Sequence, residues 1–434
     1  MSPYNAEFPI VQVALDFIDL DRALRIAREA VRGGTVWLEA GTPLIKSEGL
    51  NVIRTLRAEF PHHTIVADLK IMDAGRVEVE MAAKAGADIA VALGQSTDAT
   101  IMQCIEAGRN YGCRIAVDTI GCPDPARRAR EAQAMGADLV GVHLPVDEQM
   151  QGLAATERLK AVAAAVTIPI MVAGGVNSET AAAMVAAGAS VVIVGGAIHK
   201  AANATEATQA ICTAIRTRTS IGTEFFRRGG EADLVTILSR VSSSNLSDAL
   251  HRGGALEGLR QMVPGASAAG PAATVRTAPG DWAKPVEAID HARPGEILVI
   301  DAGGTAPAIW GGCATLSAQK RGLAGVVIDG YVRDYDELLE LGFPVFARGV
   351  VPNAGEPKGF GETGTPVRVG GMKIFPGDWI KADASGVVAV EKAKAVEYAN
   401  RAMDVYEQEC RIKAEIEAGN TLAGVVNLLR WEKR

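Results

Sequence analysis

Residues 10–40 read IVQVALDFIDLDRALRIAREAVRGGTVWLEA, which is a short β-branched apolar run, an amphipathic stretch with helical spacing and a second apolar run. The pattern recurs along the first two hundred residues, with apolar runs that start near residues 11, 35, 64, 88, 114, 138, 168 and 190. Intervals of 22 to 30 residues leave room for a strand, a crossover helix and two loops. Eight such units predict a closed parallel (β/α)8 barrel rather than an open doubly wound sheet.

The second half of the chain has a different sequence pattern, which indicates scattered short strands, turns at Gly and Pro, and helices mixed among them. The stretch 203–229 resembles a last barrel helix that runs into a charged, Gly-containing connector. We therefore predict an α/β protein of two parts: the barrel at residues 1–215, a linker at 216–234 and a separate mixed α/β domain at 235–434. Helical periodicity from about Ala393 to Leu429 predicts a packing or oligomerisation helix.

Composition excludes several classes of protein. The 434 residues are 48% hydrophobic and 22% charged, which is typical of folded rather than disordered chains. A formal net charge of −7 gives no electrostatic footprint for nucleic acid. The first residues lack a signal-peptide pattern, and no apolar run approaches the roughly 20 residues that span a bilayer. We expect a cytoplasmic protein with no membrane or nucleic-acid partner.

Acidic side chains follow the first three apolar runs. The runs end at Asp16, Glu39 and Asp68, and the third continues into Lys70 and Asp73. Because the carboxyl ends of barrel strands meet at one mouth, the three strand-end acids should converge there, beside the lysine. Singly, each acid would be a helix cap or a loop residue, and Asp68 with Lys70 could form a purely structural salt bridge. Together they predict a metal or proton-transfer site, and oxygen ligands without Cys or paired His suit Mg2+ or Mn2+.

The last three apolar runs add a base and a candidate phosphate site. Run six ends at His143, a candidate acid or base because histidine is the residue type whose ordinary pKa lies closest to neutral pH. Runs seven and eight end in the glycine pairs Gly174–Gly175 and Gly195–Gly196. Glycine pairs also make ordinary tight turns, but the loops after strands seven and eight are common phosphate sites in such barrels. The pattern predicts a phosphorylated substrate.

These motifs carry a family resemblance. The strings PIVQVALD, WLEAGTPLIKSEG, VADLKIMDAG, AGGV and VGGAI resemble those of the 3-hexulose-6-phosphate synthases, in the orotidine-monophosphate decarboxylase suprafamily. The resemblance covers about residues 8–215. Its Asp-x-Lys-x-x-Asp motif is common to the whole suprafamily and does not select a reaction. The nearest alternative is 3-keto-L-gulonate-6-phosphate decarboxylase, which shares the acids, the lysine and a metal-stabilised enediolate.

The resemblance implies a reversible Mg2+-dependent aldol condensation of formaldehyde with D-ribulose 5-phosphate. It implies that Glu39 and Asp68 hold the metal and that His143 moves the proton at C1. It also implies a barrel dimer, in which Asp73 reaches across the interface. Three residues are implied to order the substrate hydroxyls and the incoming aldehyde: Lys70, Asp16 and Asp73.

The second half has a candidate site of its own. WGGCAT, residues 310–315, is a Gly-rich turn before a helical stretch, and GVVIDGYVRD brings Arg333 and Asp334 to a strand end. Backbone amides at Gly311, Gly312 and Cys313 could hold a carboxylate, with Arg333 as a clamp and Asp334 as a metal anchor. The alternative is a structural Arg–Asp pair.

This half resembles the fold shared by 4-hydroxy-4-methyl-2-oxoglutarate aldolase and the regulator of ribonuclease E activity A. The segments SSSNLSDAL, PGD and ADASGVVAV contribute to the resemblance. Twenty residues separate Gly312 from Arg333, and Asp334 and Glu337 complete the spacing of the aldolase members. The resemblance implies a hydroxy- or oxo-dicarboxylate ligand and a trimer, so a homo-oligomer is expected. The alternative is an assembly or regulatory module without chemistry.

Overall fold

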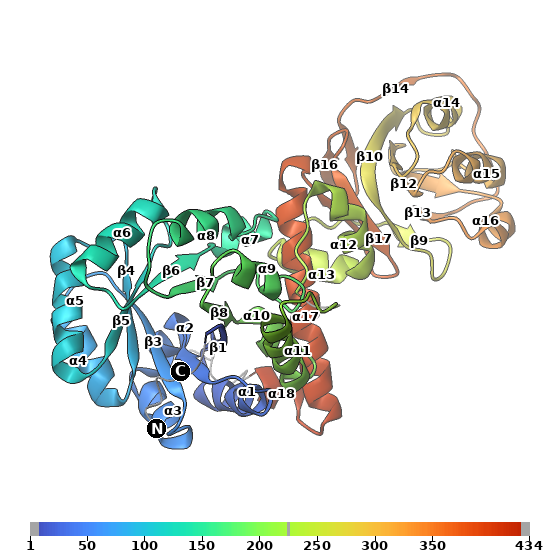
Figure 1. Ribbon diagram of the computed structural model, residues 1–434. Helices are drawn as coiled ribbons and strands as arrows, with labels where there is room; N and C mark the ends of the chain where they lie inside the picture. The colour runs from blue at the N-terminus through green and yellow to red at the C-terminus, as the bar shows by residue number, and fades with distance from the viewer. Residues whose placement is uncertain (1–7, 224–225, 427–434) are drawn as a thin grey trace. The chain divides into compact units, whose positions relative to one another are not determined.

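The computed structural model of the chain describes residues 8–223 and 226–426, which form two compact units (Figure 1). The first unit contains the described residues up to Gln149, the stretch Leu153–Arg228 and the described residues from Glu407 onwards. The second unit contains Met150–Gly152 and Gly229–Tyr406. The last part of the chain therefore belongs to the same unit as the first part, although 178 residues of the second unit separate Arg228 from Glu407 along the sequence.

The first unit is a closed barrel of eight parallel strands, which confirms the predicted fold class. β1 pairs with β2 on one side and with β8 on the other, and this last pairing closes the barrel. The strands are β1 (Ile10–Leu15), β2 (Trp37–Ala40), β3 (Thr64–Ile71), β4 (Ile89–Leu93), β5 (Arg114–Asp118), β6 (Leu139–His143), β7 (Ile170–Ala173) and β8 (Val191–Val194).

Helices join successive strands of the barrel. The first of them, α1, begins where the Asp19 side chain accepts a hydrogen bond from the Arg22 backbone N–H at 2.8 Å. Its apolar side chains face the strands. The helices are α1 (Leu20–Arg32), α2 (Thr42–Glu48), α3 (Asn51–Glu59), α4 (Gly75–Ala85), α5 (Asp98–Tyr111), α6 (Pro125–Met135), α7 (Val146–Met150), α8 (Thr156–Ala163), α9 (Ala181–Ala186), α10 (Gly196–His199) and α11 (Ala204–Thr217).

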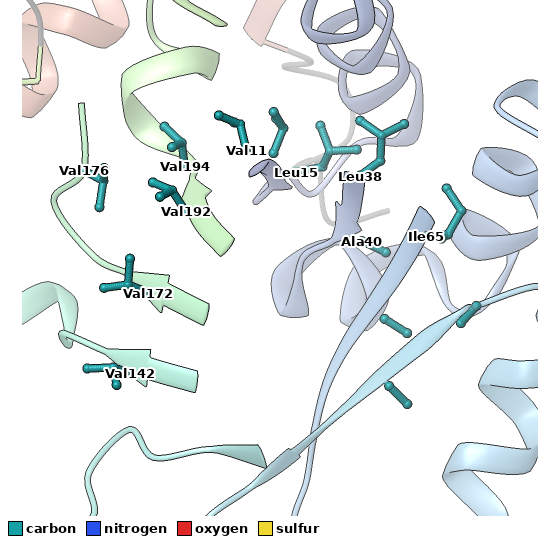
Figure 2. Close-up of a cluster of buried hydrophobic side chains, with 14 of the residues drawn as sticks. Val11, Leu15, Leu38, Ala40, Ile65, Val142, Val172, Val176, Val192 and Val194 are labelled. Atoms are coloured by element: carbon teal, nitrogen blue, oxygen red, sulfur yellow. The ribbon is translucent and has the colours of Figure 1, made fainter. Parts of the chain in front are cut away.

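Alternation along the strands divides the barrel core into two layers. Side chains such as Val11, Leu15 and Leu38 belong to the large cluster that lies between strands and helices (Figure 2). Their neighbours of opposite parity, such as Ile10 and Trp37, fill the barrel interior in a second cluster. Because side chains alternate between the two faces of a strand, every second residue is directed into the barrel. This parity decides which polar side chains reach the interior at the mouth.

The second unit is a mixed α/β domain, as predicted. β10, β11, β12 and β13 pair in parallel at its centre, and antiparallel strands extend the sheet in the order β18-β17-β10-β11-β12-β13-β9. The strands are β9 (Arg260–Gln261), β10 (Ala268–Thr277), β11 (Ile297–Asp301), β12 (Gly325–Val332), β13 (Val345–Val350), β14 (Gly361–Thr363), β15 (Val367–Val369), β16 (Met372–Ile374), β17 (Trp379–Asp383) and β18 (Gly386–Val390). Its helices are η1 (Glu231–Asp233), α12 (Leu234–Arg240), α13 (Ser243–Ala249), α14 (Ala283–His291), α15 (Gly312–Lys320), α16 (Tyr335–Leu341) and η2 (Lys392–Lys394).

The C-terminal segment is helical, but it is not one continuous helix. α17 (Ala395–Glu417) ends before Gly419, which adopts a φ of +97°, and α18 (Leu422–Val426) follows. The end of the predicted helix, residues 427–429, lies outside the described residues. None of the helices in the described part of the chain combines the length and the apolar character that a membrane span requires.

Candidate active site

Strand parity places four ionisable side chains at the mouth of the barrel. On β2, Glu39 follows the interior residue Trp37 by two positions, and on β3, Asp68 follows the interior residue Val66 in the same way. Asp118, the last residue of β5, lies two positions after the interior residue Ala116. His143, the last residue of β6, lies four positions after the interior residue Leu139. Four side chains therefore converge because each is directed into the barrel near the carboxyl end of its strand: Glu39, Asp68, Asp118 and His143.

Lys70 enters this group through a local irregularity in β3. The pairing of β3 with β4 shifts register between Ala67 and Ile71, and Lys70 adopts a left-handed φ of +48°, which is uncommon outside glycine. The Lys70 Nζ lies 3.0 Å from an Asp68 carboxylate oxygen and 3.1 Å from Asp118 Oδ2. Asp68 and Lys70 do form an ion pair. The backbone between them is irregular, because the pairing of β3 with β4 shifts register there.

The two carboxylates keep Lys70 charged. Burial alone would lower the pKa of the Lys70 ammonium, but the negative charges of Asp68 and Asp118 outweigh burial and raise that pKa above its ordinary value. The ammonium group is thus a fixed positive charge at the barrel mouth. Such a charge can stabilise an oxyanion that develops beside it.

Asp118 is a site residue that the sequence reasoning missed. Its Oδ2 lies 3.2 Å from the Nδ1 of His143 and also contacts Lys70. Burial would raise the pKa of Asp118, but the hydrogen bond and positive charge of His143, the charge of Lys70 and the Ile120 backbone N–H together lower it. The sequence did contain a signal for Asp118, because the apolar run RIAVD ends in an acid that lies two positions after the interior residue Ala116.

A carboxylate at Asp118 fixes the tautomer of His143. An ionised carboxylate can only accept hydrogen bonds, so Nδ1 of the imidazole carries a proton and donates a hydrogen bond to Asp118. In the neutral form of the ring, the Nε2 atom then has a lone pair, which is the arrangement that a general base needs. The contact therefore orients the imidazole, and its role as an acid or base stays a prediction.

The remaining acids of the mouth form a cluster with excess negative charge. Burial, followed by the charges of Asp68 and Asp16, raises the pKa of Glu39 well above its ordinary value, although the Gln12 amide donates to Glu39 at 2.5 Å. Asp16 is solvent-accessible at the recessed mouth, and partial loss of hydration together with the charge of Asp68 raises its pKa as well. Asp68 is buried and accepts a hydrogen bond from the Thr42 hydroxyl at 2.8 Å.

This cluster suits a divalent cation. Within residues 8–223 and 226–426, no three His, Cys, Asp or Glu side chains form a complete metal-ligand set. Mg2+, however, is commonly held by one or two carboxylates, while water and substrate oxygens supply the other ligands. Glu39 and Asp68 are buried oxygen donors, and the negative charges of Asp68 and Asp16 add to burial in raising the pKa of Glu39. A divalent cation at these two carboxylates would balance that charge.

The raised pKa of Glu39 predicts a pH-dependent stability. The pKa of Glu39 is higher in the folded chain than its value of about 4.3 in an unfolded chain. The free energy of unfolding therefore falls as the pH rises above about 4.3, because the folded chain binds the proton more tightly. With EDTA present, Glu39→Gln should therefore unfold about 2–4 °C above the wild type at pH 8, the shift produced by roughly 1 kcal/mol. The difference should shrink as pH falls towards 4.5. Thermal unfolding across this range checks it, and a variant that is less stable than wild type at pH 8 would contradict it.

Asp73 does not join the cluster. It is exposed in the loop before α4, and its carboxylate accepts a hydrogen bond from the Ala74 backbone N–H at 2.7 Å. Its charge acts on α4, where it adds to the effect of burial in raising the pKa of Glu78. The tertiary structure thus separates the second aspartate of the Asp-x-Lys-x-x-Asp motif from the first aspartate and the lysine.

The two glycine pairs lie in the loops after β7 and β8. Gly174 and Gly175 adopt φ values of +103° and +72°, which other residues rarely adopt. A Cβ atom at Gly174 would also lie 2.6 Å from the Leu144 carbonyl oxygen. At Gly195 a Cβ atom would lie 3.4 Å from Asp16 Oδ2, so the β8 loop borders the acid cluster. The backbone conformation explains glycine in the β7 loop, and the phosphate role of both pairs stays a prediction.

A pocket opens beside His143 on the side of the β5 and β6 loops. It has a volume of about 250 Å³. Its walls combine the base with small and apolar residues, and a Glu148–Arg158 ion pair of 2.7 Å lies at its edge. The lining residues are Thr119, Gly121, Cys122, Pro123, Pro125, Val142, His143, Glu148 and Arg158.

The second unit also brings its predicted site residues together. A parallel bridge between Trp310 and Val332 aligns the Gly-rich turn with the end of β12. Asp334, in a left-handed conformation with φ of +55°, accepts hydrogen bonds from the Gly312 backbone N–H at 3.2 Å and from Arg333 Nε at 3.3 Å. The Gly312 amide that was expected to bind a carboxylate therefore has a carboxylate partner within the chain.

The remaining residues of this second site stay near the surface. Gly311 leaves room for Asp334, because a Cβ atom at Gly311 would lie 2.4 Å from Asp334 Oδ2. Cys313 is exposed in the first turn of α15. The Arg333 side chain is 43% exposed, so its guanidinium can reach a ligand in solution. The roles of Gly311, Cys313 and Arg333 in ligand binding remain predictions.

Comparison with known proteins assigns a different family to each half. Residues 9–211 match the model of the orotidine 5'-phosphate decarboxylase / HUMPS family, and residues 243–389 match the RraA-like (Aldolase/RraA) model. The 3-hexulose-6-phosphate synthase of Mycobacterium gastri is 38% identical over 205 residues, which cover 47% of this chain and 99% of that protein. The enzyme of the same name from Methylomonas aminofaciens is 40% identical over 195 residues, 45% of this chain and 93% of that protein.

A solved structure resembles the second half. It is the structure of the RNA-processing inhibitor RraA from Thermus thermophilis, with 31% sequence identity and a TM-score of 0.32. The similarity covers 34% of this chain and 91% of that one.

Proposed function

The chain belongs through its residues 9–211 to the orotidine 5'-phosphate decarboxylase / HUMPS family, and from this premise we propose that its barrel is a 3-hexulose-6-phosphate synthase. The proposed reaction is the reversible aldol condensation of formaldehyde with D-ribulose 5-phosphate. The observation that carries the proposal is the chain of contacts from Asp68 through Lys70 and Asp118 to His143 at the barrel mouth. It places an oriented base next to a fixed positive charge.

In the proposed mechanism, His143 Nε2 removes a proton from C1 of the ribulose phosphate. Asp118 holds the imidazole in the required tautomer and stabilises its protonated form. The Lys70 ammonium, held beside Asp68, would stabilise the negative charge that develops on the substrate oxygens. C1 then attacks the formaldehyde carbon, a carbon–carbon bond forms, and the protonated imidazole returns its proton to the new alkoxide. The atoms balance, because the product is the sum of the two substrates.

Magnesium and phosphate binding complete the proposal. Glu39 and Asp68 would hold Mg2+, which supplies a Lewis acid for the substrate carbonyl when it is bound. The loops at Gly174–Gly175 and Gly195–Gly196 would bind the phosphate through backbone N–H groups. Asp73 is exposed beside α4, in keeping with a role at a barrel dimer interface.

The direct test is formaldehyde consumption with ribulose 5-phosphate and Mg2+, with wild type and Asp68→Ala compared in the full chain. We expect wild type to consume formaldehyde and the variant to lose at least about 100-fold in rate, because Asp68 contacts Lys70 and is a proposed metal ligand. Glu157→Ala is the control, since Glu157 is 84% exposed on α8. If wild type instead removes CO2 from 3-keto-L-gulonate 6-phosphate and leaves formaldehyde unchanged, the condensation is the wrong reaction.

For the second unit we propose an aldolase-like site that binds a hydroxy- or oxo-dicarboxylate. The support is that Asp334 accepts hydrogen bonds from the Gly312 amide and from Arg333. The Arg333 side chain is also open to solvent. Release of pyruvate from 4-hydroxy-4-methyl-2-oxoglutarate by wild type, and its loss in Arg333→Ala, would support catalysis. Absence of pyruvate release from a correctly assembled protein would favour an assembly or regulatory module, for which a trimer is expected.

A further inference from the structure

A buried carboxylate near the C-terminus makes contacts that the proposed reaction does not use. Glu407 lies on α17, belongs to the barrel unit and is 1% exposed. Its carboxylate lies 2.8 Å from one guanidinium nitrogen of Arg228 and 3.3 Å from another. It also accepts a hydrogen bond from the backbone N–H of Phe226. Glu407 therefore holds the connector that follows the last barrel helix.

Phe226 is held in a conformation that its side chain disfavours. Its φ of +57° lies in the left-handed region, which is rare for a bulky residue. Both of its backbone polar groups are bonded: the N–H to Glu407 and the carbonyl oxygen to the Asn177 side-chain amide at 3.0 Å. Strain of this kind persists only where the surroundings impose it, and it is concentrated at functional positions.

The ring of Phe226 lies against the loop after β8. A Cβ atom at Gly196 would lie 2.1 Å from Cε2 of Phe226, so the ring occupies the space that any larger residue would need. The Arg228 guanidinium covers the ring at 4.5 Å from its centroid, and the Lys200 ammonium lies 6.0 Å from that centroid. Phe226 is thus wedged against one of the two glycine loops.

The Asn177 contact connects Phe226 to the other glycine loop. Asn177 follows Gly174 and Gly175 in the β7 loop and is buried. Its Oδ1 accepts hydrogen bonds from the backbone N–H groups of Glu179 and Thr180, at 2.9 and 3.0 Å. The amide nitrogen of the same side chain donates to Phe226. One residue of the connector therefore contacts both loops that were assigned to the phosphate.

We propose that Glu407 is a positioning residue for the sugar phosphate, which acts by holding Phe226 between the β7 and β8 loops. The proposal rests on the proposed function, because it takes these loops as the phosphate site. In this proposal Glu407 does not contact the substrate itself. Its removal should loosen the loops and weaken phosphate binding, while the base and the ammonium at the strand ends keep their geometry. Glu407 follows the second unit along the sequence but belongs to the barrel unit. The proposal therefore makes the barrel site depend on a residue that the chain reaches only after the second unit.

The test uses the full chain and the variants Glu407→Gln and Phe226→Leu. The first keeps the size of the side chain but removes its charge, and the second keeps the backbone hydrogen bonds but removes the ring. We expect each variant to raise KM for ribulose 5-phosphate, and its Kd in calorimetry, by about tenfold, with kcat within about twofold of wild type. Glu409→Gln is the matched control, since Glu409 is 42% exposed on the same helix.

The outcomes separate this proposal from a purely structural role and from the proposed function. Variants that have a lowered Tm but an unchanged KM and Kd would overturn the positioning role. So would a fall in kcat at constant KM. If wild type fails to bind ribulose 5-phosphate in calorimetry, the proposed function fails and the positioning role fails with it. If wild type binds and only Glu407→Gln misfolds, Phe226→Leu still decides the question.

Discussion

Replacing Lys70 by methionine is expected to lower kcat for formaldehyde consumption about 100- to 1000-fold, the loss typical when one preorganised electrostatic group is removed. Asp68 and Asp118 hold the Lys70 ammonium at 3.0 and 3.1 Å, and their charges keep it protonated across the physiological pH range. Methionine keeps most of the length of the side chain but has no charge with which to stabilise an oxyanion. Steady-state rates with saturating ribulose 5-phosphate measure the effect.

A matched control separates this effect from general damage. Lys160→Met removes a lysine that is 57% exposed on α8 and paired with its neighbour Glu157, and its rate should equal that of wild type. Tm should be recorded for both variants. A Lys70→Met protein that is folded and retains more than about a tenth of the wild-type kcat would show that the ammonium does not act on the transition state.

Replacing Arg411 by methionine is expected to lower the free energy of unfolding of the barrel by about 3–5 kcal/mol, the usual cost of removing one partner from a buried ion pair. The Arg411 side chain is 8% exposed and lies 2.8 Å from Glu29 on α1 and 2.8 Å from Glu415. It also donates to the carbonyl oxygens of Ala201 and Ala202, at 3.3 and 3.1 Å. The variant would leave two partly buried carboxylates without their cation.

Differential scanning calorimetry checks this expectation. A loss of this size should lower the Tm of the barrel transition by roughly 10 °C. Lys413→Met is the control on the same helix, because Lys413 is 67% exposed and 3.8 Å from Glu409, and its Tm should change by less than about 2 °C. Equal Tm values for the two variants would mean that the end of α17 adds nothing to the stability of the barrel.

Much of the candidate site could be predicted from strand ends. Glu39, Asp68 and His143 each end an apolar run with the interior parity, and the structure places all three at the barrel mouth. Asp118 was missed, although the same rule selects it, because its run contains no conspicuous motif. Strand parity does not extend to Asp73: three residues after Lys70 the chain has left the strand, Asp73 is exposed, and its role at a dimer interface stays a prediction.

The sequence alone determined the architecture of both halves, because hydrophobic periodicity and interval length are local properties that a barrel or a mixed sheet must satisfy. It also determined which residue types meet at the mouth, since parity is set one strand at a time. Only the tertiary structure decided that Lys70 reaches Asp118, through a bulge with a left-handed residue. Only the tertiary structure decided that Glu407 and Arg411 belong to the barrel. Their partners Arg228 and Glu29 are 179 and 382 residues away, and contacts at such separations follow from packing, which no local pattern encodes.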